Sequence, residues 1–126
     1  MNATTKRPVF LDLFRIKLPA AGIMSIVHRI TGVLMIFATP VLVWLLDRSV
    51  SSADGFAGVA AFLGSGAGLL LVFLGLWAVF HHLFAGLRYL LIDMDVGVDK
   101  PLFQQTALAV LVSAPVVAAI VTGVLR

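Results

Sequence analysis

Two short groups of polar residues stand inside otherwise apolar stretches of the sequence, and the first contains Ser25, His28 and Arg29. In a helix, Ser25 and Arg29 share one face because they lie four residues apart, and His28 and Gly32 share the neighbouring face. A hydroxyl and a guanidinium that point into one protein crevice can donate hydrogen bonds to a carbonyl oxygen or a carboxylate. A second interpretation stays open, in which Arg29 extends to lipid phosphates and Ser25 bonds to its own backbone.

The second group lies at residues 81–93 and contains a histidine on a polar stripe. At 100° per residue, four side chains fall within about 60° of one another on a helix: His82, Gly86, Tyr89 and Asp93. A neutral imidazole with a glycine one turn away, which admits a flat macrocycle, suits axial ligation of a haem iron. His81 points about 100° away, so the two neighbouring histidines cannot bind one iron from the same rigid helix.

The residues alone leave two other roles open for these histidines. A histidine inside a membrane can make a hydrogen bond between two helices. Three histidines also raise the question of zinc or copper. However, His28 and His82 fall on different helices, and no carboxylate or cysteine completes a tetrahedral set of ligands.

The composition of the whole chain decides the environment of these groups. Of the 126 residues, 61% are apolar and 12% are charged, and the mean hydropathy is +1.11. Soluble domains contain about 45–50% apolar and about 25% charged residues, so an ordinary soluble enzyme is excluded. The net charge of +3 is spread thinly, which argues against nucleic-acid binding. Because the chain has no cysteine, disulfides, thiolate metal sites and covalently attached c-type haem are excluded.

Stretches without charged residues mark the membrane spans. About 20 helical residues cross a hydrocarbon core of about 30 Å, and three charge-free stretches cover residues 30–46, 55–87 and 101–125. We therefore expect an all-α integral membrane protein that forms a single domain over residues 1–126. The expected transmembrane helices cover about 20–47, 64–90 and 102–125. We expect a loop or interfacial segment at about 55–63, and a kink at Pro115.

Basic residues near the ends of the spans predict the orientation. Seven lie on the side of the N terminus and the second loop: Lys6, Arg7, Arg15, Lys17, Arg29, Arg88 and Lys100. Only Arg48 and Arg126 lie on the opposite side, so we expect the N-terminal lead 1–18 to be cytoplasmic and to lack a cleavable signal peptide. Three small helices enclose little space, so we expect them to pack against a second membrane subunit, with Gly64 and Gly68 permitting close approach.

Several motifs resemble the cytochrome b subunits of succinate dehydrogenase, the larger of the two membrane anchors in respiratory complex II. They are Arg7-Pro8-Val9, Leu11-Asp12-Leu13, Ser25-Ile26-Val27-His28-Arg29-Ile30-Thr31-Gly32 and His82-Leu83-Phe84-Ala85-Gly86-Leu87-Arg88. The last two, in this order and separated by a full hairpin, form a specific pair. The likeness covers almost the whole chain.

This resemblance implies an electron-transfer role in a complex of four subunits. In the family, a flavoprotein subunit oxidises succinate to fumarate and an iron–sulfur subunit carries the electrons to the membrane. This chain and a second, smaller anchor subunit bind ubiquinone and one haem b. His82 matches the axial haem ligand on this subunit, and the partner anchor supplies the other. Ser25 and Arg29 match residues of the quinone pocket, while His28 and Arg29 match positions near the haem propionates.

The resemblance leaves some positions and alternatives open. Tyr89 stands where some relatives have a histidine, and no role for His81 follows. Asp93 is a candidate member of a proton relay from the cytoplasmic side. We expect the inner membrane of a bacterium rather than of a mitochondrion. An anchor subunit of a fumarate reductase and a purely structural anchor without haem remain alternatives, whereas transport is disfavoured because no continuous polar stripe crosses the membrane.

Overall fold

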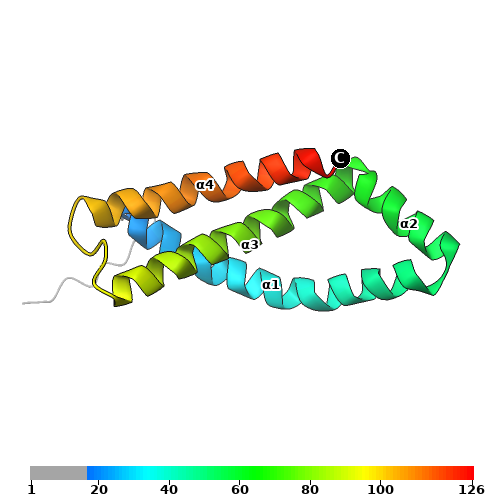
Figure 1. Cartoon of the computed structure of the whole chain (residues 1–126), viewed down its shortest axis with the longest axis horizontal. Coiled ribbons are helices and arrows are strands. Elements are labelled where there is room, and N and C mark those ends of the chain that lie inside the picture. Colours follow the sequence, from blue (N-terminus) through cyan, green and yellow to red (C-terminus); the bar gives the residue numbers. More distant parts are fainter. Residues whose placement is uncertain (1–16) are drawn as a thin grey trace, which may run out of the picture.

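The computed structural model describes residues 17–126, so most of the expected lead lies outside the described residues. Three long helices run through this part of the chain: α1 (Ala20–Ser51), α3 (Gly66–Asp93) and α4 (Leu102–Val124). A shorter helix, α2 (Ala53–Gly64), connects α1 to α3. Figure 1 shows α4 running antiparallel along α3, α1 crossing α3, and α2 bridging the far ends of α1 and α3.

The three long helices are apolar enough and long enough to cross a bilayer. At about 1.5 Å per residue they measure about 48, 42 and 35 Å, which exceeds a hydrocarbon core of about 30 Å. Large apolar side chains remain exposed, for example Ile36, Phe37 and Val50 with 70%, 69% and 74% of their surface accessible. Because such a surface is stable only against lipid or an apolar partner, the expected all-α membrane fold is confirmed.

The helix boundaries differ from the sequence-based expectation between α1 and α3. α1 extends to Ser51, four residues beyond the expected end at residue 47. The expected loop or interfacial segment at 55–63 lies inside helix α2, so the loop interpretation is wrong. This segment is apolar and carries no proline, and nothing within it interrupts a helix once the chain has turned.

Two serine caps explain how the chain turns twice between helices. Ser52 is extended, and its hydroxyl oxygen accepts a hydrogen bond of 2.9 Å from the N–H of Gly55. Ser65 does the same for α3, accepting a bond of 3.1 Å from the N–H of Gly68. Serine is a favoured N-cap because its oxygen satisfies an N–H group that the helix leaves unbonded. Each serine therefore ends one helix and begins the next.

The two glycines that the sequence offered for close packing differ in role. A Cβ at Gly68 would collide with the carbonyl oxygen of Phe62, so α3 can start against α2 only with glycine here. A Cβ at Gly64 would meet nothing within 4 Å. Gly68 thus permits a close approach inside the chain, whereas the expected approach of a second subunit at Gly64 stays a prediction.

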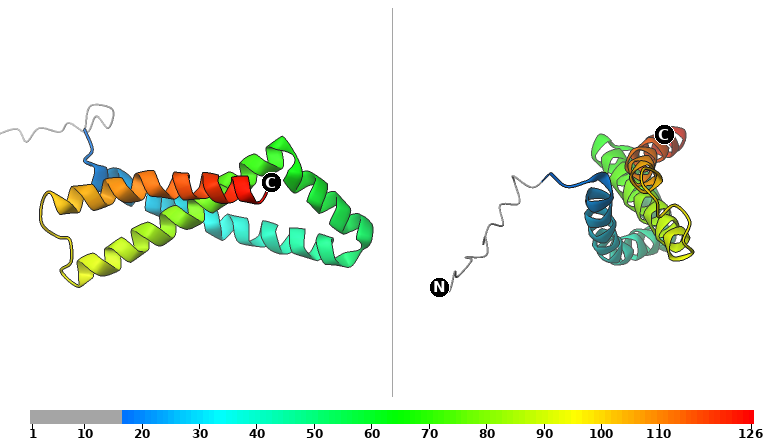
Figure 2. Two further views of the ribbon diagram at one scale, coloured as in Figure 1. Left: turned by 45° about the horizontal axis from the view of Figure 1, so that its top comes forward. Right: turned by 90° about the vertical axis from the view of Figure 1, so that its left-hand side faces the viewer.

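Small residues also bring the long helices together. The buried face of α4 repeats every three or four residues, which places its members on one side of the helix: Ala107, Val110, Ala114 and Ala118. With Met24 of α1 and Ala85 of α3, the first two of these form the core. This core lies where α1 begins, α3 ends and α4 begins, at the end of the bundle visible on the left of Figure 2, left panel.

Helix α4 also completes the start of α1. Pro19 precedes α1 and offers no side-chain cap, but the side-chain oxygen of Gln104 accepts a hydrogen bond of 3.3 Å from the N–H of Ala21. Helix α4 itself continues through Pro115 to Val124. The expected kink at Pro115 stays a prediction.

We expect Ala118→Leu to destabilise the packing of α4. Ala118 is fully buried, and overpacking a tight interface costs about 1–3 kcal/mol. The thermal midpoint of the purified complex in detergent should fall. Ala119→Leu is the matched control because Ala119 is exposed on the same helix. Equal losses in the two variants would contradict this packing.

Candidate functional site

The centre of the site is a group of three rings between α1 and α3, which we call the imidazole cluster: His28, His82 and Tyr89. The rings of His28 and His82 are stacked, with centroids 4.1 Å apart and planes inclined by 16°. Tyr89 meets the His28 ring edge-on, with centroids 5.3 Å apart. All three residues are half-buried, so the cluster reaches the surface of the chain between the two helices.

One hydrogen bond orients the His82 ring. Its Nδ1 lies 3.1 Å from the carbonyl oxygen of His28. A carbonyl oxygen can only accept, so Nδ1 carries the proton and Nε2 of the neutral ring keeps its lone pair. A ring whose other nitrogen donates to a backbone carbonyl is the usual arrangement of a metal-binding histidine. The buried hydroxyl of Thr31 donates to the same carbonyl oxygen at 3.0 Å.

Gly32 makes this approach of His82 to α1 sterically feasible. A Cβ at Gly32 would lie 3.0 Å from Cε1 of His82, closer than side chains ordinarily pack. A Cβ at Gly86 would lie 4.0 Å from Nε2 of His28, which is an ordinary contact. Helical spacing points to Gly86, one turn from His82 on the same helix, as the position that leaves space, whereas the tighter contact lies at Gly32 on the opposite helix. Contacts across helices cannot be read from spacing along one of them.

His81, which had no assigned role, is buried between α1 and α3 with 1% of its surface exposed. Its Nε2 lies 3.5 Å from the carbonyl oxygen of Met24, a long contact, and its Nδ1 has no hydrogen-bond partner among residues 17–126. Met24 and His28 are one turn apart on α1, so the two adjacent histidines of α3 touch successive turns of α1. Helical spacing could have revealed this burial, because His81 shares a face with the small residues Ala78 and Ala85.

Ser25 and Arg29 lie beside the cluster on the same side of α1, half-buried and exposed respectively. Within residues 17–126, the hydroxyl of Ser25 makes no hydrogen bond, whereas that of Thr39 donates back to its own helix at 2.9 Å. Arg29 borders a shallow hollow of about 260 Å³ on α1, whose other lining residues are apolar: Ile30, Val33 and Leu34.

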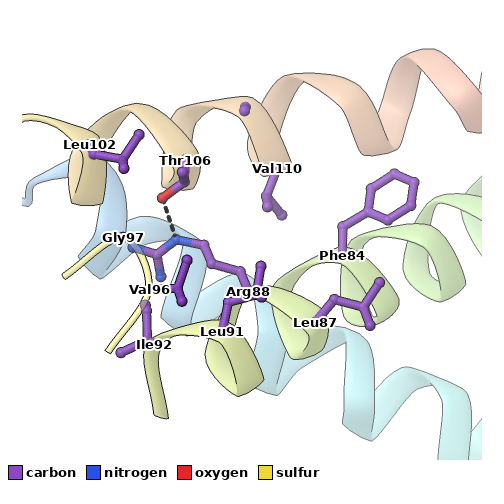
Figure 3. Close-up of a pocket in the computed structure, with 11 residues that line it drawn as sticks. Phe84, Leu87, Arg88, Leu91, Ile92, Val96, Gly97, Leu102, Thr106 and Val110 are labelled. Atoms are coloured by element: carbon purple, nitrogen blue, oxygen red, sulfur yellow. Dashed lines mark hydrogen bonds between the residues drawn. The ribbon is translucent and has the colours of Figure 1, made fainter. Parts of the chain in front are cut away.

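Arg88 precedes Tyr89 but faces α4 and is buried, with 6% of its surface exposed. Its Nε donates to the hydroxyl of Thr106 at 2.9 Å, and its Nη2 donates to the carbonyl oxygen of Phe103 at 2.7 Å. The guanidinium carbon also lies 4.5 Å from the centre of the Phe103 ring. Figure 3 shows the bond to Thr106, which ties α3 to α4. From the sequence, Arg88 is expected only to contribute to the membrane orientation, and its contacts with α4 are not predictable from spacing along α3.

Asp93 is the last residue of α3 and is exposed, about one helical turn beyond Tyr89. The structure therefore gathers His28, His82 and Tyr89 and leaves Asp93 at the end of the bundle. No group of three or more histidine or acidic side chains within residues 17–126 is arranged to hold a metal ion.

Comparison with known proteins identifies the family of this chain. Residues 3–122 match a family described as the succinate dehydrogenase/fumarate reductase transmembrane subunit. A succinate dehydrogenase cytochrome b556 subunit of Coxiella burnetii is 39% identical over 102 residues, which is 80% of each chain. That of Paracoccus denitrificans is 33% identical over 116 residues, covering 92% of this chain and 88% of the relative. A succinate dehydrogenase cytochrome b560 subunit of Reclinomonas americana is 33% identical over 104 residues, covering 79% and 72%. This membrane protein therefore belongs to the succinate dehydrogenase/fumarate reductase transmembrane subunit family.

Proposed function

We propose that the chain is the haem b-binding membrane anchor of a succinate dehydrogenase and helps to reduce ubiquinone in a bacterial inner membrane. The observation that carries this proposal is His82, whose Nδ1 is held by the carbonyl oxygen of His28 and whose Nε2 is left for iron. The names of the relatives, cytochrome b subunits of succinate dehydrogenase, support the same cofactor. They also favour succinate oxidation over fumarate reduction as the direction of turnover.

The residues of the cluster fit a haem that lies between this chain and a neighbour. His82 is half-buried at the surface between α1 and α3, so its Nε2 is accessible from outside the chain. His28 and Arg29 would supply polar and cationic contacts to the propionates. His82 is the one axial ligand that we assign to this chain, so the second axial ligand would come from a second anchor subunit. When bound, a haem supplies a one-electron carrier whose potential is set by its axial ligands and their hydrogen bonds.

Ser25 and Arg29 are the proposed donors to ubiquinone. Their face of α1 presents a hydroxyl and a guanidinium beside the apolar hollow bordered by Arg29. Both groups can donate to a quinone carbonyl oxygen, and the guanidinium stabilises the negative charge that develops there during reduction. The hollow offers an apolar surface to the rest of the molecule.

Quinone reduction also consumes two protons, which must come from water. Asp93 is exposed at the end of α3, and Tyr89 lies one turn nearer the centre of the membrane, next to the His28 ring. A carboxylate followed by a phenol and an imidazole can carry protons inward from the cytoplasmic side. The N terminus would lie on that side, in agreement with the distribution of basic residues.

The other proposed partners are the subunits that carry out the remaining steps of electron transfer in such a complex. We propose that a flavoprotein subunit oxidises succinate and an iron–sulfur subunit delivers its electrons to this anchor. This chain alone is not expected to oxidise succinate. The exposed apolar surface of α1, including Ile36 and Phe37, offers the second anchor a large contact area.

We predict that His82→Ala abolishes or strongly changes the haem b absorption of the complex, because it removes the proposed ligand and His81 is buried, with 1% of its surface exposed. The measurement is a reduced-minus-oxidised spectrum of the purified complex, with its subunits identified on a gel. His81→Phe is the control, since it keeps an aromatic ring in the same buried position. Loss of colour in the control with retention in His82→Ala would assign the ligand to His81. A colourless wild-type complex would leave only a structural anchor.

We predict that Gly32→Ala shifts the haem midpoint potential and lowers the haem content, because its Cβ would push the His82 ring away from α1. Overpacking of this kind costs about 1–3 kcal/mol, enough to leave part of the complex without haem. The control is Gly75→Ala, whose Cβ would meet nothing within 4 Å. A redox titration and a haem-to-protein ratio measure both effects. Identical values in the two variants would show that His82 does not need this close contact.

We predict that Arg29→Ala lowers the rate of ubiquinone reduction by succinate about 10- to 100-fold, the range expected when a charged hydrogen-bond donor is lost. Succinate oxidation by a soluble artificial dye should be unchanged, since it bypasses the membrane. Arg48→Ala is the control because Arg48 is exposed near the opposite end of α1. Normal ubiquinone turnover in Arg29→Ala would remove Arg29 from the site.

A further inference from the structure

The side of α3 that faces away from the imidazole cluster carries a feature that electron transfer does not use. A hollow of about 280 Å³ lies between α3, α4 and the loop that joins them. Its lining side chains are apolar except for Arg88 and Thr106 (Figure 3). Leu87 and Leu91, which also line it, lie about 140° and 180° round α3 from His82. The hollow and the proposed haem therefore occupy different faces.

The charge of Arg88 is not neutralised by the described part of the chain. The guanidinium is buried, and its partners are a hydroxyl, a backbone carbonyl and an aromatic ring, all of them uncharged. It forms no ion pair with any of residues 17–126, and its Nη1 makes no hydrogen bond to them. A desolvated cation is costly unless an anion compensates it. The hollow therefore favours an anionic group beside Arg88.

The level of the guanidinium matches the membrane–water boundary. Arg88 reaches Phe103, the second residue of α4. The adjoining loop exposes Asp95, Asp99 and Lys100, which must lie in water or among headgroups. In Figure 3 the guanidinium lies at the loop end of the hollow, while Phe84 and Leu87 lie towards its other end. The polar end of the hollow is thus at the depth of lipid phosphates, and the apolar end is at the depth of acyl chains.

We propose that this hollow binds one phospholipid of the leaflet on the side of the α3–α4 loop. Its phosphate contacts Arg88, and one acyl chain lies along Leu87 and Phe84. A planar guanidinium suits a phosphate because it presents several donors in one plane. The volume is close to the lower limit of about 300 Å³ for small-molecule pockets, so it suits a segment of one acyl chain. A free phosphate ion would leave the apolar lining unused.

The test uses the intact complex, stripped of lipid in detergent and titrated with dioleoylphosphatidylglycerol. Native mass spectrometry counts the lipid molecules bound per complex. We expect one tightly bound lipid in the wild type, which is not displaced by equal amounts of inorganic phosphate or of dioleoylglycerol, the same chains without the phosphate. Arg88→Gln should weaken this binding at least about tenfold, because it removes the charge.

A second pair of variants keeps the test independent of Arg88, which also joins α3 to α4. Ala109 is exposed and lines the hollow, so Ala109→Phe should fill it and weaken lipid binding at least about tenfold. Ala119 is exposed on the same helix outside the hollow, so Ala119→Phe should bind as the wild type does. Both variants should keep the haem spectrum and the rate of quinone reduction.

Four results would overturn the proposal. Equal affinity of the wild type and Ala109→Phe would place the lipid elsewhere. Displacement of the lipid by inorganic phosphate would reduce the site to a simple anion site, and displacement by ubiquinone would assign the hollow to a quinone. Loss of the second anchor subunit from Ala109→Phe alone would show that a protein covers this face. None of these results depends on whether His82 binds haem, so failure here is distinct from failure of the proposed function.

Discussion

The hydrogen bond from Nδ1 of His82 to the carbonyl oxygen of His28 is the constraint on which the proposed chemistry depends. It fixes which ring nitrogen carries the proton, and it turns the other nitrogen away from α1. The ring also lies close against α1 at Gly32, where a Cβ would come within 3.0 Å of Cε1 of His82. One contact between two helices thus determines which nitrogen of the His82 ring is protonated, where the ring points and how closely it approaches α1.

The rest of the bundle holds these two helices in place. Alanines on α4 and α3 let the helices approach closely, and the buried ring of His81 packs one turn before the contact of His82. On the other side, Arg88 joins α3 to α4 through Thr106 and Phe103. Because α3 is held from both sides, its rotation about its own axis is restricted, and with it the direction of His82.

Much of the architecture could be predicted from the sequence because a segment that crosses a bilayer as a helix must be apolar and about 20 residues long. Charge-free stretches gave three spans, and a polar stripe on residues 82–93 separated His82 from His81. The sequence did not predict that α2 is a helix, because glycines such as Gly55 and Gly58 suggested a loop. Ser52 caps this helix, but a serine is equally common in turns, so its presence alone does not indicate a helix. Spacing alone could not find the contact of Gly32 with His82 or that of Arg88 with Thr106. Both join helices whose relative rotation depends on the packing of the whole bundle.

The decisive measurement is an experimental structure of the intact complex at a resolution that shows side-chain rotamers around the haem. We expect that Nε2 of His82 lies within bonding distance of the iron, that Nδ1 still donates to the carbonyl oxygen of His28, and that a second subunit supplies the opposite ligand. An iron bound through His81 or His28, or an anchor without haem, would contradict the proposed function.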